Sequence, residues 1–137
     1  MEQEWIEVEA MIEAPINEVW EKWTTSEHVT KWNFAHVSWC CPKATIDLRE
    51  GGAFSFRMEA VDGSVGFDFN GTYEEVEEQE FLSITLGDGR KWEVEFSDLG
   101  MSTHVTERFH PESENPIEMQ QAGWQSILNQ FKTYCEE

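Results

Sequence analysis

The strongest pattern of apolar positions lies in the last segment of the chain, residues 116–134. Its large side chains recur at steps of three and four residues, which places them on one face of an α-helix. The positions on this face are Ile117, Gln121, Trp124, Ile127, Leu128, Phe131 and Tyr134. Asn115 suits the N-cap and Pro116 the first helical position. We expect Gly123, which weakens a helix interior, to let another backbone approach beside Trp124.

Most of the remaining chain alternates between apolar and polar residues, which predicts β-strands buried on one face. The predicted strands are residues 4–13, 44–49, 53–60, 66–76, 81–86, 90–97 and 101–109. Short connections, most of them containing glycine, join the last six strands and predict an antiparallel meander. Gly66 and Gly71 lie inside one strand and indicate bulges or a bend there. A bent sheet would curl around the C-terminal helix, which is the natural cover for its apolar face.

Two short helices are predicted after the first strand. Pro15 opens the first helix, and its apolar residues on one face are Ile16, Val19, Trp20 and Trp23. Residues 24–27 have the spacing of a capping box and start the second helix, which ends near Trp32. Residues 33–42 show no clean period, so we interpret them as a loop that turns Phe34 and Trp39 inward.

The length of 137 residues predicts a single domain that spans residues 1–137. Nine basic and 28 acidic residues give a net charge of 9 − 28 = −19. Such a charge repels phosphate backbones and anionic lipids, so we expect no nucleic-acid partner and no membrane insertion. The odd set Cys40, Cys41 and Cys135, two of them adjacent, and an acidic N-terminus unlike a signal peptide favour a reducing, cytoplasmic location.

Five stretches of the sequence are similar to motifs of a known family. They are APINEVW at 14–20, IDLREGG at 46–52, FNGTYEEV at 69–76, DGR at 88–90 and GWQSIL at 123–128. On these stretches the chain resembles the bacterial proteins similar to the C-terminal domain of the Hsp90 ATPase activator. That family belongs to the START-like (Bet v 1-like) helix-grip superfamily. The resemblance implies an α+β fold in which a curved antiparallel sheet carries the long C-terminal helix on its concave face, with an apolar cavity between them.

The expected cavity would bind a small apolar molecule, such as a lipid, a sterol-like or a polyketide-type compound. Pockets of this kind have mostly aromatic and aliphatic walls with a few placed polar groups. Trp32 is expected near the mouth. The other ligand-binding candidates are Phe56, Met58, Phe67, Phe69, Trp92, Val94, Glu107, Trp124 and Ile127. The alternative is that the same side chains fill an ordinary close-packed core.

Glu107 is an acidic residue at a position where the pattern predicts burial. By strict alternation it shares the inner face with Thr103, Val105 and Phe109. A carboxyl group there must be paired, hydrogen-bonded or neutral. It could orient a ligand hydroxyl or act as an acid or base. The alternatives are a bulge that turns it to solvent, or a partner such as Arg108 or a nearby hydroxyl.

No metal, cofactor or catalytic residue is assigned from the sequence. Cys40 and Cys41 are adjacent and lack the spacing of two to four residues typical of zinc-binding pairs. Two further functions stay open beside ligand binding. An enzyme of the cyclase or aromatase kind, which some relatives of the fold are, would need two polar groups in the cavity, for which Glu107 and Tyr73 are candidates. A chaperone-partner module is suggested by the name of the family.

Overall fold

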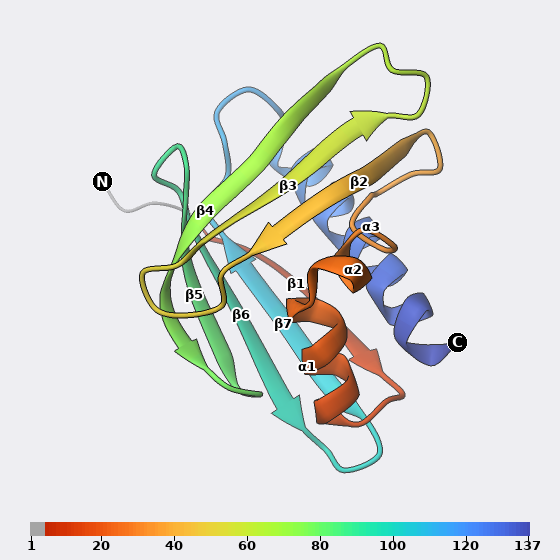
Figure 1. Ribbon diagram of the computed structural model, residues 1–137, viewed down its shortest axis with the longest axis vertical. Coiled ribbons are helices and arrows are strands. Elements are labelled where there is room, and N and C mark those ends of the chain that lie inside the picture. The colour runs from red at the N-terminus through yellow and green to blue at the C-terminus, as the bar shows by residue number, and fades with distance from the viewer. Residues whose placement is uncertain (1–4) are drawn as a thin grey trace.

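Seven antiparallel strands form one curved sheet, with the long helix α3 on its concave side (Figure 1). We describe it from a computed structural model, for residues 5–137. The strands are β1 (Ile6–Ile12), β2 (Trp39–Ile46), β3 (Ala53–Ala60), β4 (Gly66–Glu77), β5 (Phe81–Leu86), β6 (Lys91–Asp98) and β7 (Thr103–Phe109). The helices are α1 (Ile16–Thr24), α2 (Ser26–Val29) and α3 (Ile117–Glu136). Within residues 5–137, none of these helices has the length and apolar content that crossing a membrane requires.

The strand order β1-β7-β6-β5-β4-β3-β2 confirms the predicted meander of the last six strands. It also places the first strand beside the last, with Ile6 opposite Phe109 and Ile12 opposite Thr103. Helix α1 packs against α3 and β6, and α2 packs against β2. The predicted α+β helix-grip fold, with two short helices after the first strand, is therefore confirmed.

Aromatic side chains hold α3 on the sheet and on α1. The ring of Trp124 stacks on Phe109 of β7, with centroids 3.8 Å apart and planes 11° apart. Phe131 packs against both Trp23 and Trp32, at centroid distances of 4.9 and 4.7 Å. Leu128, which lies between Trp124 and Phe131 along α3, is fully buried. Since each aromatic side chain buries roughly 150–250 Å², these contacts make the apolar face of α3 part of the main core.

Polar side chains of α3 occupy the free edge of β1. Gln121 and Gln125 donate from Nε2 to the carbonyl oxygens of Glu7 and Glu9, at 3.1 and 3.0 Å. Lys132 donates from Nζ to the carbonyl oxygen of Met11 at 2.6 Å. These carbonyls belong to a strand at the end of the sheet, where a backbone without a partner strand is a template for unwanted pairing. The helix therefore covers both the face and one edge of the sheet.

Strand β2 differs from its prediction, because it starts at Trp39 instead of residue 44 and ends at Ile46 instead of residue 49. Trp39 pairs with Ala60, and the register then shifts between Cys40 and Lys43. Pro42 lies in that shift and has no N–H to donate, which is tolerated on an edge strand. This shift interrupts the alternation between apolar and polar residues that marks a strand, so the sequence pattern indicated a loop.

The bend of β4 also lies at another place than expected. Its register shifts between Tyr73 and Glu75, not at a glycine. Gly71 instead allows close packing, because a Cβ there would come within 2.7 Å of the Thr85 carbonyl oxygen and 3.0 Å of the Phe54 ring.

Two helix starts were wrongly predicted from capping residues. Thr24 is the last residue of α1, and its hydroxyl donates to the Trp20 carbonyl at 2.7 Å, so it caps no second helix. Pro116, not Asn115, occupies the N-cap of α3. The Asn115 side chain donates to the Glu112 carboxylate at 2.7 Å instead.

The expected close approach at Gly123 is also wrong. A Cβ added at this residue of α3 would have no heavy atom within 4 Å. Gly123→Ala should therefore raise the free energy of unfolding by roughly 0.5–1 kcal/mol, the cost of glycine in a helix interior. Urea denaturation of both proteins measures this difference.

Gly51→Ala is the matched control, because Gly51 has φ +85°, which only glycine adopts without strain. This variant should be less stable than the parent. A loss of stability in Gly123→Ala as well would show that another segment does approach α3 there.

Candidate ligand-binding cavity

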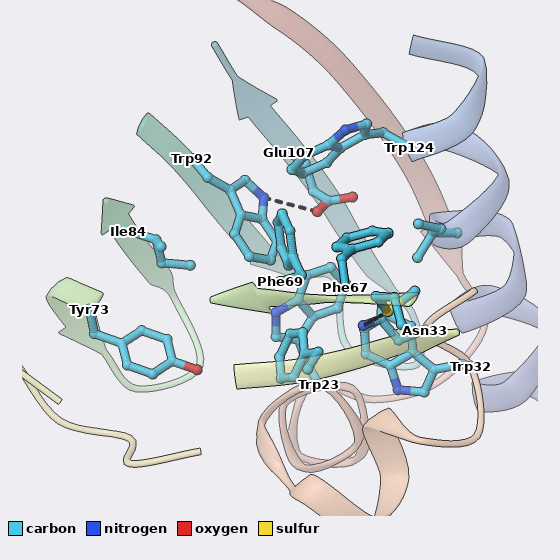
Figure 2. A pocket seen from close by; sticks show the side chains of 13 residues that line it. Trp23, Trp32, Asn33, Phe67, Phe69, Tyr73, Ile84, Trp92, Glu107 and Trp124 are labelled. Carbon is cyan, nitrogen blue, oxygen red and sulfur yellow. Dashed lines mark hydrogen bonds between the residues drawn. The ribbon is translucent and has the colours of Figure 1, made fainter. Parts of the chain in front are cut away.

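A cavity of about 180 Å³ lies between the concave face of the sheet and α3. The strands β3 to β7 and the helices α1 and α3 all contribute side chains to its wall (Figure 2). All but one of the residues predicted from the sequence line it. The other lining residues are Trp23, Asn33, Tyr73 and Ile84, of which only Tyr73 was considered for the cavity from the sequence, as a polar group for an enzyme.

Val94 is the predicted residue that does not line the cavity. It lies on the inner face of β6, as its alternation indicates, but it is fully buried among core side chains. Its neighbours in the sheet are Leu82 and Glu107. Alternation along a strand identifies the face of a residue, and it does not distinguish a side chain at the cavity from one packed in the core.

Trp32 lines the cavity, but the expectation that it lies near the mouth is wrong. Its ring is buried against Trp23, at a centroid distance of 5.0 Å. Its Nε1 donates to the Lys22 carbonyl at 3.0 Å. Trp32 is therefore an enclosed part of the wall, next to Phe131 of α3.

The mouth lies between the start of β4 and the middle of α3. Phe67 is 51% exposed, although it shares the inner face of β4 with Phe69 and Tyr73. Trp124 and Ile127 of α3 are half-buried on the other side. These side chains are the exposed part of the lining, so the cavity meets the surface among them.

Glu107 on β7 directs its carboxyl group into this cavity (Figure 2). Its side chain is 3% exposed, and Trp92 Nε1 donates to Oε1 at 3.0 Å. Oε2 has no hydrogen-bond partner among residues 5–137. Burial raises the pKa of this carboxyl to about 8, although the Trp92 hydrogen bond acts in the opposite direction. The group is therefore mostly neutral at pH 7.

The structure excludes two of the alternatives for Glu107, an outward bulge and a pairing with Arg108, and its described hydrogen-bond partner is Trp92 and not a hydroxyl. The register of β7 is regular on both sides, so no bulge turns the residue outward. Arg108 lies on the opposite face and pairs with Glu93 at 2.9 Å. The prediction of an inward carboxyl is confirmed.

Asn33 and Tyr73 are the other polar groups in the wall. The Asn33 side chain is buried, and its Nδ2 meets Met58 Sδ at 3.6 Å and Cys41 Sγ at 4.0 Å, which are weak acceptors. The Tyr73 hydroxyl points toward the cavity (Figure 2) and has no partner in the described part of the chain. Burial raises the pKa of Tyr73, so it stays protonated.

The lining is thus apolar, with a few neutral polar atoms at pH 7. Within residues 5–137, no three His, Cys, Asp or Glu side chains are placed to hold a metal ion. A cavity of about 150 Å³ binds benzene, and drug-sized ligands occupy roughly 300–1,000 Å³. The present cavity of about 180 Å³ matches an uncharged molecule of one or two rings.

Comparison with known proteins identifies relatives of this chain in sequence and in fold. Residues 13–136 match the family model described as Activator of Hsp90 ATPase homolog 1-like protein. The AHSA1-like protein of Aeromonas hydrophila is 41% identical, with a TM-score of 0.89 over 96% of this chain and 91% of that one. A protein of Cytophaga hutchinsonii is 45% identical, with a TM-score of 0.82 over 94% and 90% of the two chains. No match was found among curated proteins.

The neutral carboxyl of Glu107 predicts a specific dependence of stability on pH. Its folded pKa of about 8 lies above the ordinary value of 4.5, so the folded state holds a proton that the unfolded state releases between these pH values. The contribution of Glu107 to stability should fall by roughly 1.4 kcal/mol per pH unit between about pH 5 and 8, and then level off.

Glu107→Gln removes this contribution and isolates it. Urea denaturation of both proteins at several pH values should show the parent losing stability relative to the variant as the pH rises. Near pH 5 both side chains are neutral, which serves as the internal control, and the two proteins should differ little there. A constant difference from pH 5 to 8 would show that the carboxyl is not held neutral.

Proposed function

The chain belongs to the family of Activator of Hsp90 ATPase homolog 1-like proteins, and from its cavity we propose that it binds a small, uncharged and largely apolar molecule between the curved sheet and α3. The observation that supports this proposal is a cavity with mainly aromatic walls and a few polar side chains that face it. If these side chains only formed a close-packed core, they would leave no such space between them.

Three rings from separate elements form the part of the wall most suited to a flat ligand. Phe69 of β4, Trp92 of β6 and Trp124 of α3 have pairwise centroid distances of 5.9, 6.1 and 5.4 Å. The contacts of Trp124 with the other two are edge-on, with interplanar angles of 77° and 82°. Aromatic rings favour such edge contacts, so the ring of a ligand bound here would bury apolar area and make favourable edge contacts.

Volume and charge restrict the class of ligand. The lining holds no charged partner for an anion, and the net charge of −19 repels one at a distance. A sterol or a long-chain lipid needs more space than about 180 Å³, since pockets for molecules of that size occupy roughly 300 Å³ or more. We therefore restrict the proposal to compounds of one or two rings.

A panel of uncharged one- and two-ring compounds, including indole and naphthalene, tests the proposal by NMR titration of the tryptophan indole N–H signals. We expect at least one compound to shift the signals of Trp92 and Trp124. Ile127→Trp places a larger side chain at the mouth and should weaken binding about tenfold or more, which corresponds to about 1.4 kcal/mol.

Ile117→Trp is the matched control, because Ile117 begins the same helix, is partly exposed and does not line the cavity. This variant should bind like the parent. If no compound of the panel shifts the cavity signals of the parent, the proposed function is wrong.

A second candidate function is a role as partner of an Hsp90-type chaperone. The family match over residues 13–136 is the observation that favours it. In this case the purified chain should raise the ATPase rate of Hsp90 from the source organism, and Ile127→Trp should not change that effect, because it alters only the cavity. An unchanged ATPase rate at saturating chain would reject this role.

A further inference from the structure

The geometry points to Glu107 as the group that recognises the ligand, and we propose that the ligand is a small aromatic aldehyde, ketone or quinone whose carbonyl oxygen accepts a hydrogen bond from this carboxyl. The inference rests on the proposed function, because it specifies the class of molecule for the same cavity. It depends on four features of the wall, which concern the two carboxyl oxygens, the other lining groups, the nearby rings and the burial of the site.

The two oxygens of Glu107 have different surroundings. Oε1 accepts the hydrogen bond of Trp92 Nε1 at 3.0 Å. In a neutral carboxyl group the carbonyl oxygen is the better acceptor, so this bond assigns the carbonyl to Oε1 and the hydroxyl to Oε2. Oε2 has no partner within residues 5–137, and it belongs to a side chain that lines the cavity. A protonated Oε2 is therefore a donor without an acceptor.

That donor reaches the open space of the cavity, because every fully buried side-chain N or O atom among residues 5–137 has a hydrogen-bond partner. A ligand that fills this space without accepting from Oε2 would bury the donor unsatisfied, which costs about 1–3 kcal/mol. Burial raises the pKa of Glu107 to about 8, which agrees with a proton on this carboxyl at neutral pH. A ligand oxygen that accepts from Oε2 removes the unsatisfied donor, whereas a hydrocarbon of the same shape does not.

Of the other polar groups in the wall, Tyr73 favours an acceptor on the ligand as well, whereas the Asn33 amide can donate or accept. Tyr73 on β4 is the other titratable side chain in the described lining, and its hydroxyl is also a donor. Burial raises the pKa of Tyr73 and keeps that proton in place. The contributions from β3, β5, β6, α1 and α3 are apolar side chains and tryptophans, so no described lining residue is a cation that would hold a carboxylate ligand.

The aromatic part of the ligand follows from the neighbours of Glu107. Trp92, which holds Oε1, also faces Trp124 at a centroid distance of 5.4 Å. Figure 2 shows the Glu107 carboxyl beside Trp92 and below Trp124 in this view. A ligand ring in contact with them lies next to Oε2, so an aromatic carbonyl compound makes the ring contacts and the hydrogen bond at the same time.

Two probes of nearly equal shape test the inference. Acetophenone carries a carbonyl oxygen where α-methylstyrene carries a CH₂ group. Both are titrated into the parent chain at about pH 6 and at about pH 9, with the tryptophan indole signals as the readout. At about pH 6 we expect acetophenone to bind roughly three- to tenfold tighter, the net gain of one hydrogen bond. At about pH 9 Glu107 is mostly ionised and no longer donates, so this preference should disappear.

Two variants separate the hydrogen bond from the packing. Glu107→Gln keeps a donor at every pH, so the preference for acetophenone should persist at both pH values. Glu107→Leu removes the donor, so the preference should disappear while α-methylstyrene still binds. The circular dichroism spectrum of each variant confirms that it is folded, and the pH comparison in the parent needs no variant.

The outcomes distinguish this inference from the proposed function. Equal affinity of the parent for both probes at about pH 6 would overturn the inference and leave the proposed function in place. A preference for acetophenone that persists in folded Glu107→Leu would also overturn it. If neither probe binds to the parent, the proposed function fails for this class of compound and the inference fails with it.

Discussion

The packing of α3 into the concave face of the sheet is the interaction on which the rest of the structure depends. Trp124 stacks on Phe109, and Phe131 packs against both Trp23 and Trp32. These contacts bury the apolar faces of the sheet, of α1 and of α3 together. The cavity lies within the same packing, with Trp92 and Trp124 among the residues of its wall. Glu107 is shielded from water by the same packing.

The polar side of α3 fixes how the helix lies along the sheet. Gln121, Gln125 and Lys132 bond three successive outward carbonyls of β1, at Glu7, Glu9 and Met11. A net hydrogen bond of this kind contributes only about 1 kcal/mol, but the three together allow one register of the helix. This register places Trp124 over Phe109, and it thereby sets the position of the wall opposite Glu107.

Periodicity predicted the strands, the C-terminal helix and the buried face of each element, whereas the cavity between sheet and helix was implied by the family resemblance. The alternation of β7 was sufficient to predict the inward carboxyl of Glu107, since no bulge interrupts that strand. Asn33 was missed because it lies in a stretch without period, where only the folded chain brings it to Met58. Val94 was wrongly predicted to line the cavity, because alternation identifies the face of a strand on which a residue lies but does not show whether its side chain reaches the cavity. The role of Gln125 at the edge of β1 could not be predicted, because a polar residue on a helix normally faces solvent.

The central claim is that burial between the sheet and α3 keeps the carboxyl group of Glu107 neutral. Neutrality follows from burial alone, because Trp92 is the one described hydrogen-bond partner of Glu107 and it favours the charged form. The most direct measurement is an NMR titration of the Glu107 carboxyl carbon in the folded protein. We predict a midpoint at a pH of about 8. A midpoint near 4.5, the ordinary value for glutamate, would show that water reaches the carboxyl and would contradict the account.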